Sequence, residues 1–242
     1  MADAAGDVIQ PYFRQKIDII GKADSSPVTI ADRDAEMAMR NLIEVAFPDH
    51  GIIGEEHGDV RTDAEYVWVL DPIDGTLSFI SGSPTFGTLI ALTRNGIPVM
   101  GILNQPISNE RWVGANGTTT LNSTPISTRE CAHLSEATLF AWGAELMEGS
   151  HEQQFRNLYG AVKRKRFGYD CYAYGLLSLG FVDIIADCDM KPFDYCALVP
   201  IVENAGGKIT DWGGNPLTLS NPGYVLATGD IGLHSQAVKI LE

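Results

Sequence analysis

The first half of the chain consists largely of short apolar runs that are rich in β-branched and aromatic residues and are separated by polar turns. Such runs are typical of buried strands. Two pairs of runs are joined by an Asn-Gly step, which is a strong hairpin signal: residues 86–93 with 97–104, and residues 112–115 with 118–121. Another run, over residues 66–70, predicts a further buried strand. We therefore predict a meandering antiparallel sheet for this half.

Helical periodicity occurs twice before these strands. Residues 1–15 place Val8, Ile9, Tyr12 and Phe13 on one face, which predicts an amphipathic helix. The same spacing predicts a helix over residues 31–47, with an inward face made of Ala35, Ala38, Met39, Leu42 and Ala46. Between the two helices we expect a short strand over residues 17–20 and a polar loop over residues 22–29.

The second half alternates between the two periodicities, which predicts an α/β arrangement. Strands are expected over residues 138–142, 166–169, 182–186, 208–212 and 224–227. Helices are expected over residues 151–162, 171–179 and 193–204, the last interrupted or bent near Pro200, with a closing helix that runs to Leu241. Polar and charged residues cluster over residues 124–135. We therefore predict an N-terminal α+β domain, residues 1–134, and a C-terminal α/β domain, residues 135–242.

Composition narrows the class of protein and of partner. A hydrophobic fraction of 45% and a charged fraction of 20% are those of an ordinary globular protein. No apolar run reaches the ~18 residues that a membrane-spanning helix needs, and the first residues lack the features of a signal peptide. A net charge of −14 repels nucleic acid and anionic lipid. We predict a cytoplasmic protein that acts on a small molecule, with neither nucleic acid nor membrane as its partner.

Two local features bear on these predictions. The basic run over residues 163–166 could form a nucleic-acid patch, but we interpret it as the solvated end of a helix, where cations favour the dipole. The four cysteines show no Cys-x-x-Cys spacing, and no histidine lies near them in the rhythm of a zinc site. We therefore expect reduced thiols.

The candidate chemistry begins where the run over residues 66–70 ends, at Asp71-Pro72-Ile73-Asp74-Gly75-Thr76. Pro72 has no amide donor and Gly75 permits unusual backbone angles, so we expect the strand to stop and the chain to turn there. Two carboxylates three residues apart on such a turn can converge, which is costly without a cation between them. The amides that follow Gly75 would offer a seat for a phosphate.

An alternative is that Asp71 and Asp74 are only residues of a β-turn, where Asp, Pro and Gly are common. That alternative does not account for a second acidic pair, Glu55-Glu56, which follows another short apolar run at residues 52–53. The combination favours a hard-cation site, and a cation beside a phosphate seat indicates metal-assisted phosphoryl chemistry.

The segment around Asp71 and Asp74 resembles the first signature of the inositol monophosphatase family of magnesium-dependent, lithium-sensitive phosphatases. The resemblance extends over nearly the whole chain and includes Gly54-Glu55-Glu56, Pro192-Phe193-Asp194 and residues 203–207. It implies an α+β fold, the layered α-β-α-β-α sandwich of this family, and a homodimer. Residues 86–92, 170–175 and 191–195 are more closely similar to the histidinol-phosphate phosphatase branch.

The resemblance also implies roles for individual residues. Two to three Mg²⁺ ions, which Mn²⁺ can replace, would be held by Glu55, Asp71, the carbonyl of Ile73, Asp74 and Asp194. Thr76, supported by Asp32, would activate the water for direct in-line attack, and the amides of Gly75 and Thr76 would hold the phosphate. Without the resemblance, Asp32 would be assigned as a helix N-cap and Asp194 as a solvated acid.

The implied substrate is L-histidinol phosphate, in histidine biosynthesis. Asp187 stands at the place of an acid that contacts substrate in the family. Asp170 belongs to the segment peculiar to the histidinol-phosphate branch, and its carboxylate would suit the ammonium group of that ester; the alternative is that it caps a helix beginning near Cys171. Ser78 departs from the Asn that is common in the inositol-specific branch. An inositol-1-phosphatase, a broad-range phosphatase and a non-catalytic homologue remain alternatives.

Overall fold

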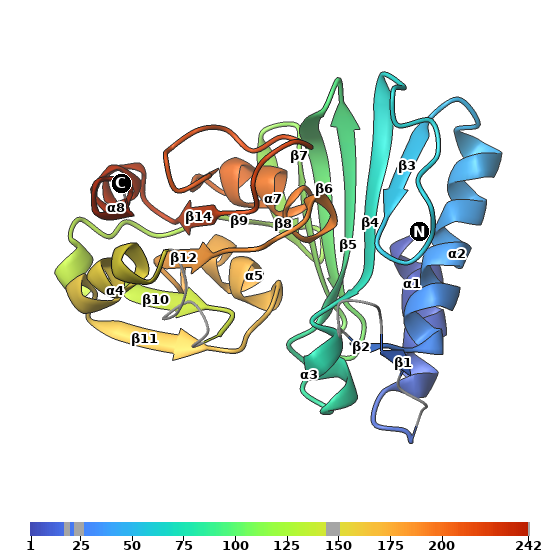
Figure 1. The fold of residues 1–242 in the computed structure, drawn as a ribbon, viewed down its shortest axis with the longest axis horizontal. Helices are drawn as coiled ribbons and strands as arrows, with labels where there is room; N and C mark the ends of the chain where they lie inside the picture. The colour runs from blue at the N-terminus through green and yellow to red at the C-terminus, as the bar shows by residue number, and fades with distance from the viewer. Residues whose placement is uncertain (17–19, 22–26, 144–150, 242) are drawn as a thin grey trace.

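The computed structural model of the chain describes residues 1–16, 20–21, 27–143 and 151–241. Its elements form alternating layers of helices and sheets (Figure 1): two helices, a seven-stranded sheet, two further helices, a five-stranded sheet and an outer pair of helices. The layered α-β-α-β-α sandwich is therefore confirmed. In the described part of the chain, no helix is long and apolar enough to cross a membrane.

The seven-stranded sheet follows the order of the chain. Its strands are β3 (Gly51–Gly54), β4 (Tyr66–Asp74), β5 (Gly87–Arg94), β6 (Ile97–Gln105), β7 (Glu110–Ala115), β8 (Thr118–Leu121) and β9 (Thr124–Ile126). Neighbours are antiparallel except β3 and β4, which are parallel. Both Asn-Gly hairpins are confirmed: Asn95 and Gly96, like Asn116 and Gly117, have the positive φ angles of a tight primed turn.

One face of this sheet is covered by α1 (Ala2–Ile9), which continues into the 3₁₀ turn η1 (Gln10–Tyr12), and by α2 (Ile30–Ala46). The inward face predicted for α2 was partly wrong: Leu42 is 45% exposed and Ala46 is exposed, whereas Ile43 is buried. Strand β1 (Ile20–Gly21) begins at the last residue of the predicted strand, and it pairs with β2 (Pro27–Val28), which lies in the predicted loop. The rest of the predicted strand and loop, residues 17–19 and 22–26, lies outside the described residues.

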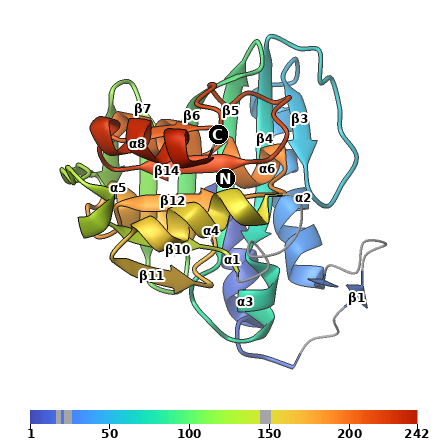
Figure 2. The same ribbon diagram turned by 60° about the vertical axis from the view of Figure 1, so that its left-hand side comes forward.

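The five-stranded sheet is mixed and has the order β11-β10-β12-β14-β13. Its strands are β10 (Thr138–Ala141), β11 (Arg164–Phe167), β12 (Ile184–Asp187), β13 (Lys208–Thr210) and β14 (Val225–Thr228). β10 is parallel to β11 and β12, and the other neighbours are antiparallel. The outer helices, α4 (Glu152–Ala161) and α8 (Ile231–Leu241), cover its outer face (Figure 2), and the short 3₁₀ turn η2 (Leu134–Glu136) precedes β10.

Two helices, α5 (Tyr172–Ser178) and α7 (Leu198–Asn204), fill the layer between the sheets. Two glycines of the first sheet allow α7 to lie directly on it. A Cβ on Gly101 would come within 1.9 Å of the Ala197 carbonyl oxygen, and one on Gly114 within 2.4 Å of the Pro200 oxygen. The largest buried cluster consequently joins strands of both sheets to α5 and α7.

The interruption expected near Pro200 in the helix over residues 193–204 is present. The segment is divided into α6 (Pro192–Tyr195) and α7, and Pro200 lies in the first turn of α7, just after the break. That position tolerates proline because its amide would have no partner within the helix. The domain division at residues 134/135 stays a prediction.

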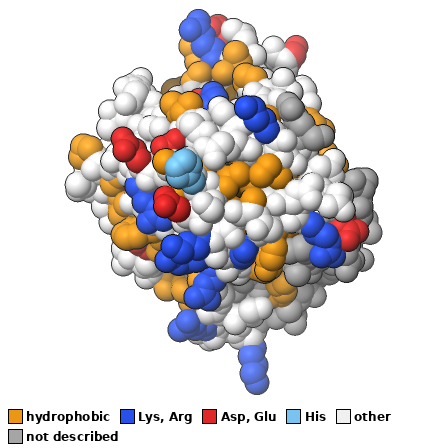
Figure 3. Space-filling model, turned by 90° about the vertical axis from the view of Figure 1, so that its left-hand side faces the viewer, with side chains coloured by type: hydrophobic (Ala, Val, Ile, Leu, Met, Phe, Trp, Pro, Cys, Tyr) orange, Lys and Arg blue, Asp and Glu red, His pale blue; other side chains and the backbone are white. Residues whose placement is uncertain are grey.

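The basic run over residues 163–166 is not the end of a helix. Residues from Arg164 onward form β11, which is the edge strand of its sheet. Figure 3 faces the side of the molecule that carries α4 and β11 and shows Lys and Arg side chains dispersed over it. Charged side chains on an edge strand discourage pairing with another chain, which is a structural reason for the run.

Candidate active site

The strand β4 does not stop at Asp71 as predicted but continues to Asp74. Asp71 faces Leu89 of β5 and Asp74 faces Gly87, so β4 carries one extra residue between them. Pro72 lies within this bulge, where a missing amide removes no ladder hydrogen bond. The amide of Ile73 donates to Asp71 Oδ1 at 3.0 Å. The bulge therefore changes the direction of the strand and brings both aspartates to the same side.

Asp194 joins these two residues from the other half of the chain. One carboxylate oxygen from each of Asp71, Asp74 and Asp194 lies within 4.8 Å of the other two. Asp194 is carried by α6, and its Oδ2 accepts from the backbone amide of Lys191 at 2.6 Å. The predicted convergence is present, and the β-turn and solvated-acid alternatives do not describe these side chains.

The electrostatics of this carboxylate cluster call for a cation. Burial, and then the charges of Glu55, Asp74 and Asp194, raise the pKa of Asp71 well above its usual range. Burial and the Asp194 carboxylate raise the pKa of Asp74 well above its usual range. Burial raises the pKa of Asp194 to about 7. Three carboxylates so close together are favourable as anions only when a positive charge lies among them. The oxygen-only donor set fits a hard divalent ion.

Glu55 extends the cluster from the end of β3. Its backbone amide donates to the Leu70 carbonyl at 3.2 Å, and its carboxyl group interacts with that of Asp71. The structure therefore places Glu55 next to Asp71.

A buried ion pair that the sequence analysis missed supports the loop after Glu55. Glu36 is fully buried on α2 and accepts from Arg40 Nε at 2.7 Å. It also accepts from the backbone amides of Glu56 at 2.7 Å and His57 at 3.1 Å. Arg40 Nη2 in turn donates to the His57 carbonyl at 3.1 Å. The only sequence signal was the i, i+4 spacing of the two charges on the inward side of the helix.

Replacing Glu36 with glutamine is expected to lower the free energy of unfolding by about 3–5 kcal/mol, because Arg40 would remain buried without its counter-charge. Urea unfolding measures this. Glu44→Gln is the matched control on the same helix: its pair with Arg61 is exposed on both sides, so the loss should stay within about 1 kcal/mol. Equal small losses in both variants would show that the buried pair does not support the fold.

Thr76 and Asp32 meet beside the cluster. Gly75, with a φ of 84°, ends the turn after β4, and α3 (Thr76–Ile80) begins at the next residue. Thr76 Oγ1 lies 3.4 Å from Asp32 Oδ1 and 3.2 Å from the Ile73 carbonyl oxygen. Asp32 is buried, and its Oδ2 accepts from the amide and hydroxyl of Thr29 at 2.9 and 2.6 Å. The N-cap assignment for Asp32 is wrong, because the N-cap of α2 is Thr29 and Asp32 is the third helical residue of its capping box. This place in the capping box is compatible with the contact to Thr76.

Asp170 lies against the same turn. A Cβ on Gly75 would come within 2.6 Å of Asp170 Cγ. Asp170 Oδ2 accepts from Ser78 Oγ at 2.5 Å and Thr85 Oγ1 at 3.0 Å. The helix-cap alternative for Asp170 is wrong, because the N-cap of α5 is Cys171 and has no side-chain cap bond. The Cys171 amide instead donates to Asp74 Oδ2 at 2.7 Å.

Asp187 stands at the end of β12 and is 5% exposed. Its Oδ1 accepts from the Trp142 amide at 2.9 Å and its Oδ2 from the Tyr174 hydroxyl at 2.8 Å. Burial raises the pKa of Asp187 to about 6, although these two hydrogen bonds oppose the shift. Both oxygens therefore already have a protein donor, so Asp187 is held more rigidly than a freely exposed acid would be.

A pocket of about 300 Å³ connects these groups. Its lining includes two aspartates of the cluster, Asp74 and Asp194, and the two predicted substrate contacts, Asp170 and Asp187. The remaining lining residues are Trp142, Cys171, Tyr174, Cys188, Asp189 and Met190. It is therefore the candidate active site.

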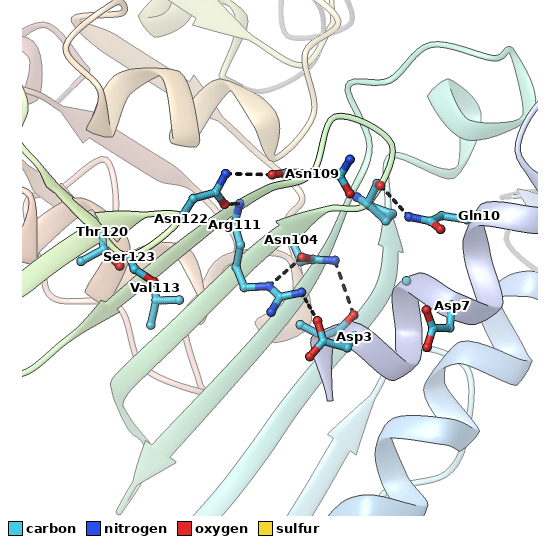
Figure 4. A pocket seen from close by; sticks show the side chains of 13 residues that line it. Asp3, Asp7, Gln10, Asn104, Asn109, Arg111, Val113, Thr120, Asn122 and Ser123 are labelled. Carbon is cyan, nitrogen blue, oxygen red and sulfur yellow. Dashed lines mark hydrogen bonds and ion pairs between the residues drawn. The ribbon is translucent and has the colours of Figure 1, made fainter.

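A larger pocket, of about 470 Å³, lies between α1 and the strands β6 to β8 (Figure 4). Its side chains pair largely with one another: Arg111 bonds Asp3 Oδ1 at 2.6 Å and Asn104 Oδ1 at 2.8 Å, and Gln10 donates to the Pro106 carbonyl. None of the predicted catalytic or metal residues lines it.

Comparisons with known proteins show the family of the chain. The profile of the inositol monophosphatase family matches residues 1–242. The bifunctional phosphatase IMPL2, chloroplastic, of Arabidopsis thaliana is 48% identical over all of this chain and 73% of its own length, and the histidinol-phosphatase of Chlorobaculum parvum is 34% identical over 96% and 91%. A solved inositol monophosphatase from Zymomonas mobilis superposes with a TM-score of 0.91 at 47% identity, over 99% of this chain and 94% of that one. The chain belongs to the inositol monophosphatase family.

Proposed function

We propose that the protein is a magnesium-dependent phosphatase that hydrolyses L-histidinol phosphate to L-histidinol and inorganic phosphate, a step of histidine biosynthesis. The observation that carries the phosphatase assignment is the convergence of Asp71, Asp74 and Asp194, of which Asp74 and Asp194 line the candidate pocket. Relatives named histidinol-phosphatase, at 31–34% identity, support the choice of substrate. Inositol-1-phosphate, or a broad range of esters, is the second candidate, favoured by the similar structure described as an inositol monophosphatase.

The metal ligands would be Glu55, Asp71, Asp74, Asp194 and the carbonyl of Ile73. These donors are all oxygen atoms, which suits Mg²⁺ or Mn²⁺. When bound, such ions neutralise charge on the phosphate oxygens and lower the pKa of water. A non-catalytic homologue is disfavoured because the complete set of acidic ligands is retained.

The residues of the chain would prepare the attacking water for proton transfer. Asp32 is positioned to hold the Thr76 hydroxyl proton, since its Oδ1 lies 3.4 Å from Thr76 Oγ1. The lone pairs of Oγ1 are then available to accept a proton from the water as it attacks phosphorus in line. Burial raises the pKa of Asp32, which favours proton acceptance there. The amides of Gly75 and Thr76 would hold the phosphate oxygens.

Phosphate release from a panel of esters, with and without Mg²⁺, tests this function. We expect release from L-histidinol phosphate to require Mg²⁺ or Mn²⁺ at millimolar concentration, to stop with EDTA and to be inhibited by lithium. Faster release from inositol-1-phosphate would favour the second candidate. Full activity in metal-free buffer would contradict the mechanism, and no release from any ester would support a non-catalytic protein.

Asp170 is proposed to select the substrate, because its carboxylate lines the pocket and can pair with the ammonium group of histidinol phosphate. Charge-assisted hydrogen bonds contribute about 1.5–3 kcal/mol. Asp170→Asn should therefore lower kcat/KM for histidinol phosphate roughly 10- to 100-fold. The left-handed backbone at residue 170, with a φ of 43°, suits asparagine equally well, so the fold should be kept.

The control for Asp170→Asn is a matched phosphate ester that lacks the amine, measured on the same two proteins. Its turnover should change little. An equal loss on both esters would assign Asp170 a general role in the structure of the site and would contradict the proposed role in specificity.

Three further expectations remain predictions. These are the number of bound ions, two or three; the homodimer; and the cytoplasmic location inferred from reduced thiols. The four cysteines are free. One relative is named as chloroplastic, and the thiols would be equally suited to any reducing compartment.

A further inference from the structure

A second group of potentially metal-ligating side chains consists of His151, Cys188 and Asp189 and shares no residue with the proposed magnesium ligands. Cys188 Sγ is 3.2 Å from His151 Nε2 and 3.3 Å from Asp189 Oδ2. One ligand atom from each of the three residues lies within 4.8 Å of the others. The proposed phosphatase mechanism uses none of them. The sequence lacks the short spacings between cysteine and histidine that are typical of zinc sites. Such spacings could not reveal this group, because 36 residues separate His151 from Cys188.

The fold positions each member of this group separately. Cys188 directly follows β12 and is 5% exposed. Asp189 has a φ of 60°, a left-handed conformation that turns its carboxylate back toward the preceding sulfur. His151 is the N-cap residue of α4, and its ring packs edge-on against Trp212 and Tyr224, with centroids 5.7 and 5.5 Å away. The aromatic contacts orient the imidazole with Nε2 toward the thiol.

The chemistry of the donors differs from that of the carboxylate cluster. Sulfur and imidazole nitrogen, with a single carboxylate, form a borderline-soft set that suits zinc rather than magnesium. Bond lengths of about 2.0–2.3 Å in a tetrahedral zinc site imply ligand–ligand distances of roughly 3.3–3.7 Å. The observed distances of 3.2 and 3.3 Å therefore need to increase by only a few tenths of an ångström to admit an ion.

We propose that His151 Nε2, Cys188 Sγ and a carboxylate oxygen of Asp189 form a binding site for Zn²⁺, with the fourth position open to water. As the zinc–sulfur bond forms, the thiol proton leaves to solvent, and the neutral imidazole binds through the Nε2 lone pair. Cys188 and Asp189 line the same pocket as Asp187 and Asp194, so the ion would border that pocket.

Cobalt binding in the presence of excess Mg²⁺ tests the site. Mg²⁺ occupies oxygen-only sites, while a thiolate-to-cobalt charge-transfer band in the near ultraviolet arises only from sulfur ligation. We expect the full-length protein to develop this band with one equivalent of Co²⁺ and to lose it when Zn²⁺ is added. Cys188→Ser should abolish the band, whereas Cys131→Ser, which alters a partly exposed thiol elsewhere, should keep it.

Asp189→Asn provides a variant whose folding is not at risk, because the residue is exposed and asparagine tolerates its left-handed backbone. It should retain the band and weaken Co²⁺ binding at least about tenfold. The proposal is overturned if the wild-type protein shows no band at saturating Co²⁺, which would leave only a thiol–imidazole hydrogen bond. It is also overturned if the band survives in Cys188→Ser, or if Asp189→Asn binds Co²⁺ as tightly as the wild type.

Discussion

Asp71→Asn is expected to abolish phosphate release at any Mg²⁺ concentration. Asp71 is 1% exposed, and its carboxylate interacts with those of Glu55, Asp74 and Asp194. An amide in its place keeps the shape and the hydrogen bond from the Ile73 amide but removes the charge that the cations need. Release of inorganic phosphate and binding of Mg²⁺, measured on the same preparation, should both fall.

The same substitution should stabilise the metal-free protein, which distinguishes lost function from lost folding. Burial and neighbouring carboxylates raise the pKa of Asp71 in the folded state above the ordinary 3.8. Folded wild-type protein therefore loses stability as the pH rises above that value, because ionisation is easier in the unfolded chain. Without Mg²⁺ at neutral pH, Asp71→Asn should unfold at a higher urea concentration than the wild type, and the difference should vanish at acidic pH.

Asp63→Asn is a suitable control, because Asp63 is exposed on the loop between β3 and β4. It should change neither phosphate release nor stability measurably. Turnover by Asp71→Asn that approaches the wild type at high Mg²⁺ would mean that the charge of Asp71 is dispensable and that the proposed ligand set is wrong.

The parts of the fold that the sequence predicted well are those with local causes. An Asn-Gly step between apolar runs is sufficient to specify a hairpin, and both hairpins are present. Asp194 is different: no local pattern links it to Asp71, and it was assigned through its likeness to a family signature. The structure supplies the physical reason, since the contacts of α6 with β4 and β5 carry it to the bulge.

The errors also have identifiable physical causes. Hydrophobic periodicity treats charged residues as outward-facing, so it missed Glu36 and Arg40, which are buried because they satisfy one another and the loop beyond Glu55. Proline was expected to end β4, but a bulge accommodates it. Cys188 and His151 meet only through the packing of α4 against the second sheet, which spacing rules cannot detect.

Thr76→Ala is expected to lower kcat by roughly 10²–10⁴-fold, the usual scale for losing positioned acid–base assistance. Thr76 Oγ1 is the atom placed between Asp32 Oδ1 and the turn that follows Asp74. Its loss removes the path by which the water proton reaches Asp32. Binding of Mg²⁺ should remain nearly normal, because all the proposed ligands are intact. The measurements are steady-state phosphate release at saturating substrate and Mg²⁺ titration of the same variant.

Thr76→Ser is the matched variant, because it keeps the hydroxyl group and removes only the methyl group. It should recover most of the rate, and the contrast between the two variants separates the hydroxyl from packing. If alanine and serine lower kcat equally, packing of the threonine methyl rather than proton transfer limits the reaction. If Thr76→Ala turns over like the wild type, another group must accept the proton, and among the described residues near the cluster the buried Asp32 carboxylate is the next acceptor to test.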